Sequence, residues 1–222
     1  MATASDRVVT VFGGTGFLGH RIVRHLRLSG FCVRVGSRHP DRGHALLGPD
    51  DAQLRSVKVD IRDQRSVTDA LTDAYGAVNA VSLYLEQGRG TFHSIHVESA
   101  QQVAAQAKRA GVKKFIHVSG IGTDPRSQSL YIRKRGEGEL AVREAFAEAI
   151  LIRPAVMFGR DDTFLNATTS VLSDVRQGPD AITAGLRGRC WAGDRKDTAT
   201  GTNWPRHVRM WWPPHLFLRG TS

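Results

Sequence analysis

Residues 13–19 have the composition and the setting of a phosphate-binding loop. They are Gly13, Gly14, Thr15, Gly16, Phe17, Leu18 and Gly19, and they stand between a β-branched run and an apolar-periodic segment. In such a loop Gly13 turns the chain sharply, Gly16 lets the backbone approach a pyrophosphate, and Gly19 lets the next helix pack closely on the strand. Free N–H groups at the helix N-terminus then face the phosphate charge. The pattern predicts a dinucleotide site; a glycine-rich turn without a ligand is the alternative.

The residues that end the second expected strand indicate which dinucleotide is bound. In NAD-selective sites an acidic side chain at this point binds the ribose 2′-hydroxyl. Here the strand leads into Ser37 and Arg38, and no carboxylate stands there. A guanidinium can pair with a 2′-phosphate through charge-assisted hydrogen bonds, and a serine hydroxyl can add another. We therefore expect NADP(H) to be preferred over NAD(H); an ordinary surface arginine is the alternative.

Strands and helices alternate along most of the chain. Apolar runs bounded by glycine or proline predict strands, and apolar residues at helical spacing predict helices. The expected strands cover residues 8–12, 32–36, 56–60, 77–83, 114–118 and 149–153. The expected helices cover residues 19–28, 64–73, 92–110 and 132–146, and the segment with Pro40 and Gly43 is expected to be a loop.

This order of elements predicts an α/β protein with a doubly wound parallel sheet, the Rossmann fold. Apolar strands that alternate with helices form a parallel sheet covered on both faces. Right-handed crossovers then place a cofactor across the carboxyl ends of the strands, where the strand order reverses. For 222 residues, one domain is the default expectation.

The last part of the chain does not continue this pattern. The expected NAD(P)-binding domain covers residues 6–178, whereas residues 179–222 lack hydrophobic periodicity and hold all four tryptophans and many arginines. We expect an irregular, poorly ordered tail there. Two hypotheses stay open: an out-of-frame or truncated sequence, and a tryptophan-rich tail that binds a partner or a membrane surface.

Composition limits the classes of function. The net charge is +10, but the arginines are scattered among acidic residues, and no aromatic-and-basic RNA-binding motif is present. We therefore expect no nucleic-acid function, whereas a phosphorylated cofactor or an anionic membrane surface suits a basic protein. Cys32 and Cys190 are too few for a disulfide framework or a cysteine metal site. Without a signal peptide or an apolar run of membrane-spanning length, a cytoplasmic protein is expected.

Three later segments, together with the glycine loop, resemble one protein family. They are Asn79–Tyr84, His117–Gly122 and Leu151–Gly159, placed where such proteins carry strands four, five and six. With Tyr131–Glu139, they are similar to the extended and atypical short-chain dehydrogenases/reductases, which include NAD-dependent epimerases and dehydratases. The subgroup they resemble most includes the NADPH-binding accessory subunit of respiratory complex I and its bacterial relatives. The resemblance covers about residues 6–178. Members continue into a smaller substrate-side region, which is expected to be cut short or replaced here.

The resemblance implies further contacts with the cofactor. Asp60 is expected to accept a hydrogen bond from the adenine amino group, with Ile61 packed on the ring; Asp60 could equally cap the following turn. Ala80, Val81 and Ser82, after strand four, are expected to line the middle of the cofactor.

The resemblance also implies a catalytic site. The family's reductases and epimerases use a tyrosine and a lysine four residues later, and the tyrosine transfers a proton while hydride moves. Tyr131 matches, but the fourth position on is Arg135, and Lys134 lies about 100° around the helix. Arg135 can bind ribose and stabilise a tyrosinate, although it is bulkier and cannot titrate. Ser119 is expected near the companion hydroxyl, which in active members lies slightly further on, where this chain has Gly120–Gly122. The alternative is that Tyr131 only packs and contacts ribose.

Metal and hydrolase chemistry are not expected. His93 and His96 lie three residues apart near Glu86, but no further ligand follows at a defined spacing. Ser119 is not in a nucleophile elbow.

Two functions follow as expectations. One is an oxidoreductase or epimerase-like enzyme acting on a small carbonyl, sugar-nucleotide or lipid-quinone-type substrate, with Tyr131 as the acid/base. The other is a non-catalytic module in which NADPH stabilises the fold and a surface docks on a partner complex. A fragment without function is a third interpretation, and a homodimer is compatible with the superfamily.

Overall fold

The computed structural model describes residues 7–157 of the chain. All of the elements given below lie within one compact unit that ends at Ala155. The expected tail at 179–222, the end of the expected cofactor domain and Cys190 lie outside the described residues.

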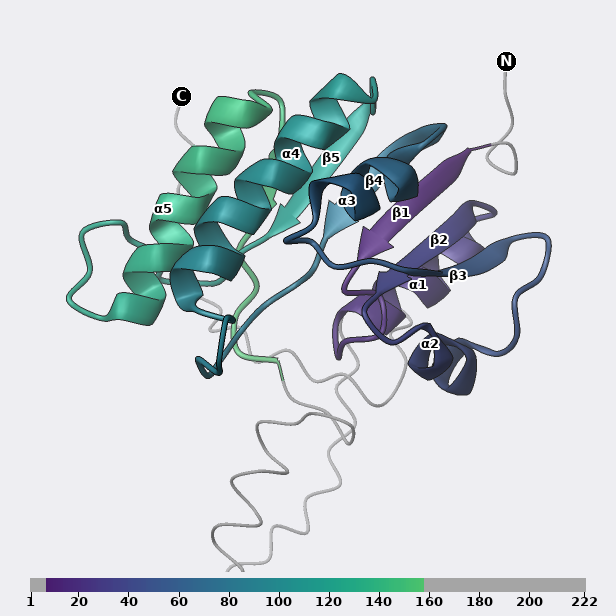
Figure 1. Ribbon diagram of the computed structural model, residues 1–222, viewed down its shortest axis with the longest axis horizontal. Coiled ribbons are helices and arrows are strands. Elements are labelled where there is room, and N and C mark those ends of the chain that lie inside the picture. Colours follow the sequence, from purple (N-terminus) through teal and green to yellow (C-terminus); the bar gives the residue numbers. More distant parts are fainter. Residues whose placement is uncertain (1–6, 158–222) are drawn as a thin grey trace, which may run out of the picture. The chain divides into compact units, whose positions relative to one another are not determined.

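A single parallel sheet of six strands organises this unit, in the order β3-β2-β1-β4-β5-β6 (Figure 1). The strands are β1 (Val8–Phe12), β2 (Cys32–Ser37), β3 (Leu54–Lys58), β4 (Ala74–Asn79), β5 (Lys114–Val118) and β6 (Ile150–Ile152). The helices are α1 (Gly19–Leu28), α2 (Pro40–Leu47), α3 (Gln64–Leu71), the π-helix η2 (Ser94–Glu98), α4 (Ser99–Arg109) and α5 (Leu130–Ala145). The strand order reverses between β1 and β4, so the predicted doubly wound Rossmann fold is confirmed.

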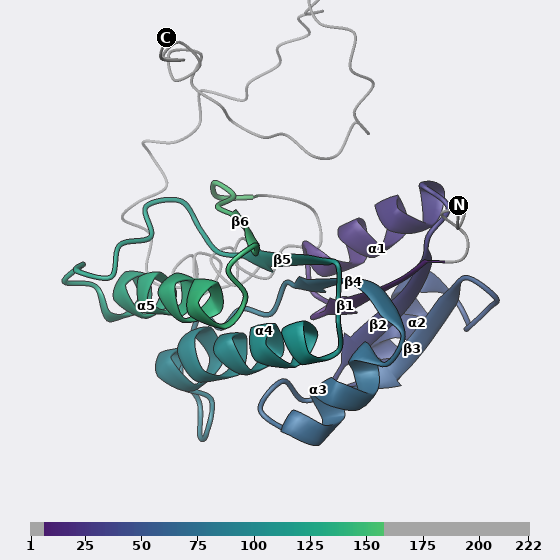
Figure 2. The ribbon, with the colours of Figure 1, turned by 90° about the horizontal axis from the view of Figure 1, so that it is seen from above.

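Each face of the sheet has its own hydrophobic cluster. Helices α3, α4 and α5 cover one face, while α1 covers the other (Figure 2). Successive side chains of β1 enter different clusters: Phe12 packs with Val103 and Phe115, whereas Val11 packs with Val23 and others. This division follows from the strand geometry, which points neighbouring side chains to opposite faces. No helix in the described part of the chain combines the length and apolar character needed to cross a bilayer.

Two strands are shifted from their predicted positions. The third was expected at 56–60 and lies at Leu54–Lys58, because Asp60 already begins the turn in which its carbonyl accepts from Asp63 N at 3.0 Å. The fourth was expected at 77–83 and ends at Asn79, where its partner β1 also ends at Phe12. The apolar residues after Asn79 therefore leave the sheet.

Two helices also differ from the prediction. The expected loop around Pro40 is helix α2, because proline at the first helical position lacks only an N–H that would have no partner there. The expected helix 92–110 is divided into η2 and α4. Ser99 Oγ donates to the carbonyl of Ser94, five residues earlier, at 2.6 Å, which supports the wider π-helical turn.

Candidate cofactor and active site

Three chain segments converge at the carboxyl ends of β1, β2 and β4. The Gly13 N–H donates to the Gly36 carbonyl at 2.9 Å, and Gly13 has a φ of 75°. A Cβ at Gly13 would lie 3.0 Å from the backbone of Ala80 and Val81. A side chain is therefore excluded at Gly13 by both conformation and space. The fold places the glycine loop directly beside the segment that was predicted to line the cofactor.

The glycine loop has the geometry of an anion cradle. Gly16 N–H donates to the Gly13 carbonyl at 2.9 Å, and a Cβ at Gly19 would overlap that same carbonyl. Within residues 7–157, the backbone N–H groups of Phe17, Leu18 and Gly19 donate no hydrogen bond to another residue. Three N–H donors at the start of α1 thus remain for a ligand, and they fit a pyrophosphate.

The predicted 2′-phosphate residues lie at the end of β2. Ser37 Oγ is 3.0 Å from Thr15 Oγ1, which links this strand end to the glycine loop. Arg38 is exposed, and its guanidinium makes no hydrogen bond or ion pair with the rest of the described chain. Hydrogen bonds from Arg62 hold the pKa of Asp60 below its usual range, and the Arg38 charge adds to this effect. Arg38 is therefore an exposed cation directly after the end of β2.

Asp60 serves the turn after β3. Its Oδ1 accepts from Arg62 N at 3.0 Å, and its two carboxylate oxygens also accept from the Arg62 guanidinium. Ile61 is 6% exposed and belongs to the hydrophobic core. Asp60 thus caps the turn that follows β3, as the alternative interpretation had it. The contacts of Asp60 and Ile61 with adenine stay predictions.

Tyr131 and Arg135 lie one turn apart on α5 and are directly bonded. Arg135 Nη1 donates to the Tyr131 hydroxyl at 2.9 Å and to Ser82 Oγ at 2.9 Å. Arg135 is 7% exposed, and its Nε has no partner in the described structure. A Cβ at Gly120 would lie 3.2 Å from that Nε, so the guanidinium fills the space beside Gly120. The bond to Ser82 joins residues far apart in the sequence and is not predicted by their spacing.

Aromatic side chains surround the Tyr131 ring. Its centroid is 6.1 Å from that of Tyr84, which stacks on it, and 5.4 Å from that of Phe92, which meets it edge-on. His96, buried in η2, approaches the ring edge-on at 5.7 Å. His96 Nε2 also lies 3.0 Å from the Leu83 carbonyl, and so fixes the segment that carries Ser82 and Tyr84. The tyrosine is thus held between the chain after β4 and helix η2.

Ser119 is placed differently from the expected companion hydroxyl. It is 3% exposed, and its Oγ lies 3.2 Å from Thr123 Oγ1. No hydrogen bond joins Ser119 to Tyr131 within the described residues. Burial would raise the pKa of Glu139, but hydrogen bonds from Arg153 and Ser119 lower it below its usual range. Ser119 thus belongs to a buried group with Thr123 and Glu139.

The two buried histidines make the stability of the fold depend on pH. Burial, assisted by the Arg135 charge, lowers the pKa of His117 from 6.5 to about 4, and burial lowers that of His96 to about 4 as well. Between pH 6.5 and about pH 4, the unfolded chain therefore binds more protons than the folded one. We therefore expect the free energy of unfolding to fall as the pH drops from 6.5 toward 4, by up to about 3 kcal/mol for each histidine.

Urea unfolding at a series of pH values checks this expectation. His117→Gln removes one titrating group and should reduce the slope of stability against pH. An unchanged slope in His117→Gln would contradict the account of its burial.

The side chains of His93 and Glu86, which the sequence places near His96, contact other groups. His93 Nε2 lies 3.4 Å from Glu98 Oε1, and the Glu86 carboxylate accepts from Phe92 N. Among residues 7–157, no group of three or more His, Cys, Asp or Glu side chains is arranged to hold a metal ion.

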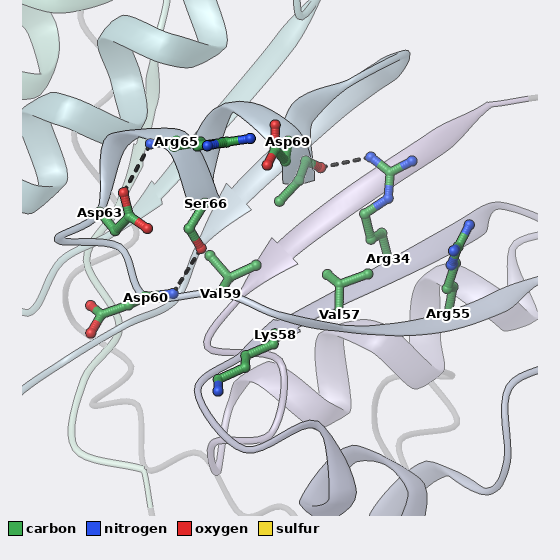
Figure 3. Close-up of a pocket in the computed structure, with 11 residues that line it drawn as sticks. Arg34, Arg55, Val57, Lys58, Val59, Asp60, Asp63, Arg65, Ser66 and Asp69 are labelled. Atoms are coloured by element: carbon green, nitrogen blue, oxygen red, sulfur yellow. Dashed lines mark hydrogen bonds between the residues drawn. The ribbon is translucent and has the colours of Figure 1, made fainter.

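A groove of about 520 Å³ runs along β3 and α3, and Tyr131 is not among the residues that line it (Figure 3). Both acidic and basic side chains line its wall, and Arg34 Nη1 donates to the Ala70 carbonyl at 2.6 Å. The Asp60 N–H donates to Ser66 Oγ at 3.1 Å at one end of the groove. Of the site residues predicted from the sequence, Asp60 alone lines this groove.

Comparison with protein families identifies the part of the chain that runs from the glycine loop through β6. Residues 13–170 match the family model described as NAD(P)H-binding. This match covers the glycine loop, the ends of β2 and β4, and the tyrosine–arginine pair.

Two curated proteins show a similarity at the level of sequence. The mitochondrial NADH dehydrogenase (ubiquinone) 1 alpha subcomplex subunit 9 of Mus musculus is 38% identical over 167 residues, which cover 74% of this chain and 44% of that protein. The ceramide reductase of Caulobacter vibrioides is 32% identical over 163 residues, which cover 73% of this chain and 50% of that protein. The chain thus spans about half the length of these relatives.

A solved structure shares the fold. A putative NAD-dependent epimerase/dehydratase from Bacillus halodurans superposes with a TM-score of 0.60 at 19% identity, covering 71% of this chain and 74% of that one. The two proteins therefore share the arrangement of the parallel sheet and its helices.

Proposed function

Because the chain belongs to the NAD(P)H-binding family, as an atypical short-chain dehydrogenase/reductase with an epimerase-like domain, we propose that it is an NADP(H)-dependent oxidoreductase of small carbonyl compounds. One observation carries the proposal: the 2.9 Å hydrogen bond from the buried Arg135 to the Tyr131 hydroxyl. A proton-transferring hydroxyl is thereby held beside a permanent positive charge. This arrangement suits a group that ionises during the reaction.

The cofactor would be held by the loops at the carboxyl ends of the strands. The N–H groups of residues 17–19 would bind its pyrophosphate, and Ser37 and Arg38 would bind its 2′-phosphate. Ala80 and Val81 would line its middle. Bound NADPH supplies the hydride that a carbonyl carbon accepts.

Tyr131 would give its proton to the carbonyl oxygen as the carbon is reduced. The resulting tyrosinate stays paired with Arg135, which holds its charge throughout because a guanidinium does not titrate in this range. Tyr131 then regains a proton from water. Arg135 thus acts by electrostatic stabilisation and not as a proton carrier.

Arg38 provides the test of cofactor preference. We expect Arg38→Ala to weaken NADPH binding by about 10- to 100-fold, since a charge-assisted hydrogen bond contributes about 1.5–3 kcal/mol. NADH binding should change little, because NADH has no 2′-phosphate. Calorimetric titration of both cofactors measures the ratio, and Arg42→Ala, on the next helix, is the matched control. Equal losses for NADPH and NADH would contradict the role of Arg38.

A second candidate function is an NADPH-binding module that docks on a partner complex or a membrane surface. Two observations favour it: the relative from Mus musculus is named as a subunit of NADH dehydrogenase, and Arg135 fills the space beside Gly120. Such a module would retain NADPH without turnover. Turnover of NADPH with a panel of aldehydes and ketones distinguishes the enzyme from the module.

A further inference from the structure

Ser82 and Tyr131 are held by the same nitrogen atom. Nη1 of Arg135 carries two N–H bonds, and the structure gives each of them one acceptor, Ser82 Oγ and Tyr131 OH, both at 2.9 Å. An arginine can only donate, so both hydroxyl oxygens accept at this point. The hydroxyl hydrogens of Ser82 and Tyr131 must therefore point elsewhere.

Neither hydroxyl donates to another residue in the described part of the chain. The two N–H bonds of one guanidinium nitrogen diverge by about 120°, so oxygens bonded to both lie roughly 5 Å apart. One acceptor atom between them can receive a hydrogen bond of ordinary length from each. Both hydroxyls are therefore free to donate to a single ligand oxygen, while Arg135 fixes the positions of their oxygen atoms.

We propose that Ser82 and Tyr131 together bind the carbonyl oxygen of the substrate, so that Ser82 provides the companion hydroxyl first expected at Ser119. The catalytic role of Ser82 rests on the proposed function, carbonyl reduction. In that reaction the carbonyl carbon gains the hydride, its oxygen gains the Tyr131 proton, and Ser82 keeps its own proton while donating a hydrogen bond.

The positions of the other hydroxyls support this choice. Ser119 is 3% exposed and is paired with Thr123, so a ligand cannot reach it without displacing buried structure. At Gly120 the guanidinium already occupies the space that a side chain would need. Ser82 is half-buried in the segment that follows β4, next to the residues Ala80 and Val81 that lie against Gly13.

The surroundings also indicate the class of carbonyl compound. Tyr84 and Phe92 pack against the Tyr131 ring, and Tyr84 is 71% exposed. Flat apolar surface therefore lies beside the Tyr131 ring. We infer that the substrate carries its carbonyl next to an aromatic or other flat apolar group.

Benzamide is a suitable probe, because its carbonyl oxygen is a strong acceptor next to a ring and NADPH does not reduce it. We expect the NADPH-saturated full chain to bind benzamide, as measured by ligand-observed NMR. Ser82→Ala should weaken this binding by about two- to tenfold, the value of one neutral hydrogen bond. Ser82→Thr, which keeps a hydroxyl, should restore it.

Two further serine variants complete the comparison. Ser129→Ala, just before α5, removes a side chain with no capping hydrogen bond and should leave benzamide binding unchanged. Ser119→Ala tests the rival assignment. A loss in Ser119→Ala without a loss in Ser82→Ala would overturn the proposal, and so would failure of the wild-type chain to bind benzamide.

Turnover separates this inference from the proposed function. Acetophenone and NADPH are the substrates for this test. If the wild type is active and Ser82→Ala lowers kcat/KM by about 10²-fold, the result supports both the proposed function and the role of Ser82. An active wild type with unaffected Ser82→Ala would overturn the inference alone. Benzamide binding that depends on Ser82, without turnover of any ketone, would overturn the enzymatic function and leave the carbonyl site standing.

Discussion

Replacing Tyr131 with phenylalanine is expected to lower NADPH-dependent carbonyl reduction by about 10²–10⁴-fold, the range for loss of a positioned proton donor. The reason is local, since the hydroxyl that accepts from Arg135 is the group with a proton to give. NADPH binding should be retained, because the pyrophosphate and 2′-phosphate contacts lie on other loops. The fall should therefore be in kcat, with little change in the dissociation constant of NADPH.

The stability of this variant must be measured alongside its activity. Removing the hydroxyl leaves one N–H of a buried guanidinium without its acceptor, which costs about 1–3 kcal/mol. Tyr75→Phe, in β4 and outside the aromatic group around Tyr131, is the matched control and should keep full activity. A Tyr131→Phe variant that reduces carbonyls at the wild-type rate would show that Tyr131 only packs there. A wild type that binds NADPH and reduces nothing would favour the docking module.

Gly19→Ala is expected to abolish measurable NADPH binding and to destabilise the fold. The added Cβ overlaps the Gly13 carbonyl, a backbone atom that also accepts from Gly16 N–H and cannot move alone. The loop must shift, which costs about 1–3 kcal/mol of unfolding free energy. Loss of two charge-assisted hydrogen bonds to the pyrophosphate would weaken binding by at least about 10²-fold.

Two other glycine variants separate binding from folding. Gly16→Ala places its Cβ 3.2 Å from the Gly13 carbonyl, so it should fold and bind NADPH more weakly. Gly76→Ala, in β4, meets nothing closer than 3.4 Å and should match the wild type in both properties. Calorimetric titration and urea unfolding give the two quantities. Normal NADPH binding by Gly19→Ala would contradict the assignment of the loop.

The fold could be predicted from the sequence where local signals and tertiary pairing agree. The bounds of β1 and α1 are as predicted, because the glycine loop ends one element and begins the other. The end of β4 was wrong, since the apolar run continues past Asn79 while pairing with β1 stops there. Helix α2 was missed because Pro40 was interpreted as a loop residue and not as a helix start.

The candidate site was predictable only in part, for a related reason. The Tyr131–Arg135 contact follows from one helical turn, which sequence spacing shows directly. The bond from Arg135 to Ser82 joins residues 53 positions apart and depends on where the chain leaves β4. Sequence spacing likewise could not show that Ser119 is buried with Thr123.

We propose that this chain binds NADP(H) at the loop that joins β1 to α1. The most direct measurement is thermal unfolding of the full chain alone and with saturating NADPH, NADP⁺ or NADH. A ligand that binds only the folded state stabilises it, by about 2.7 kcal/mol at 100 times its dissociation constant. We predict a clear rise in Tm with NADPH and NADP⁺ and a smaller one with NADH. An unchanged Tm with all three dinucleotides would contradict the account.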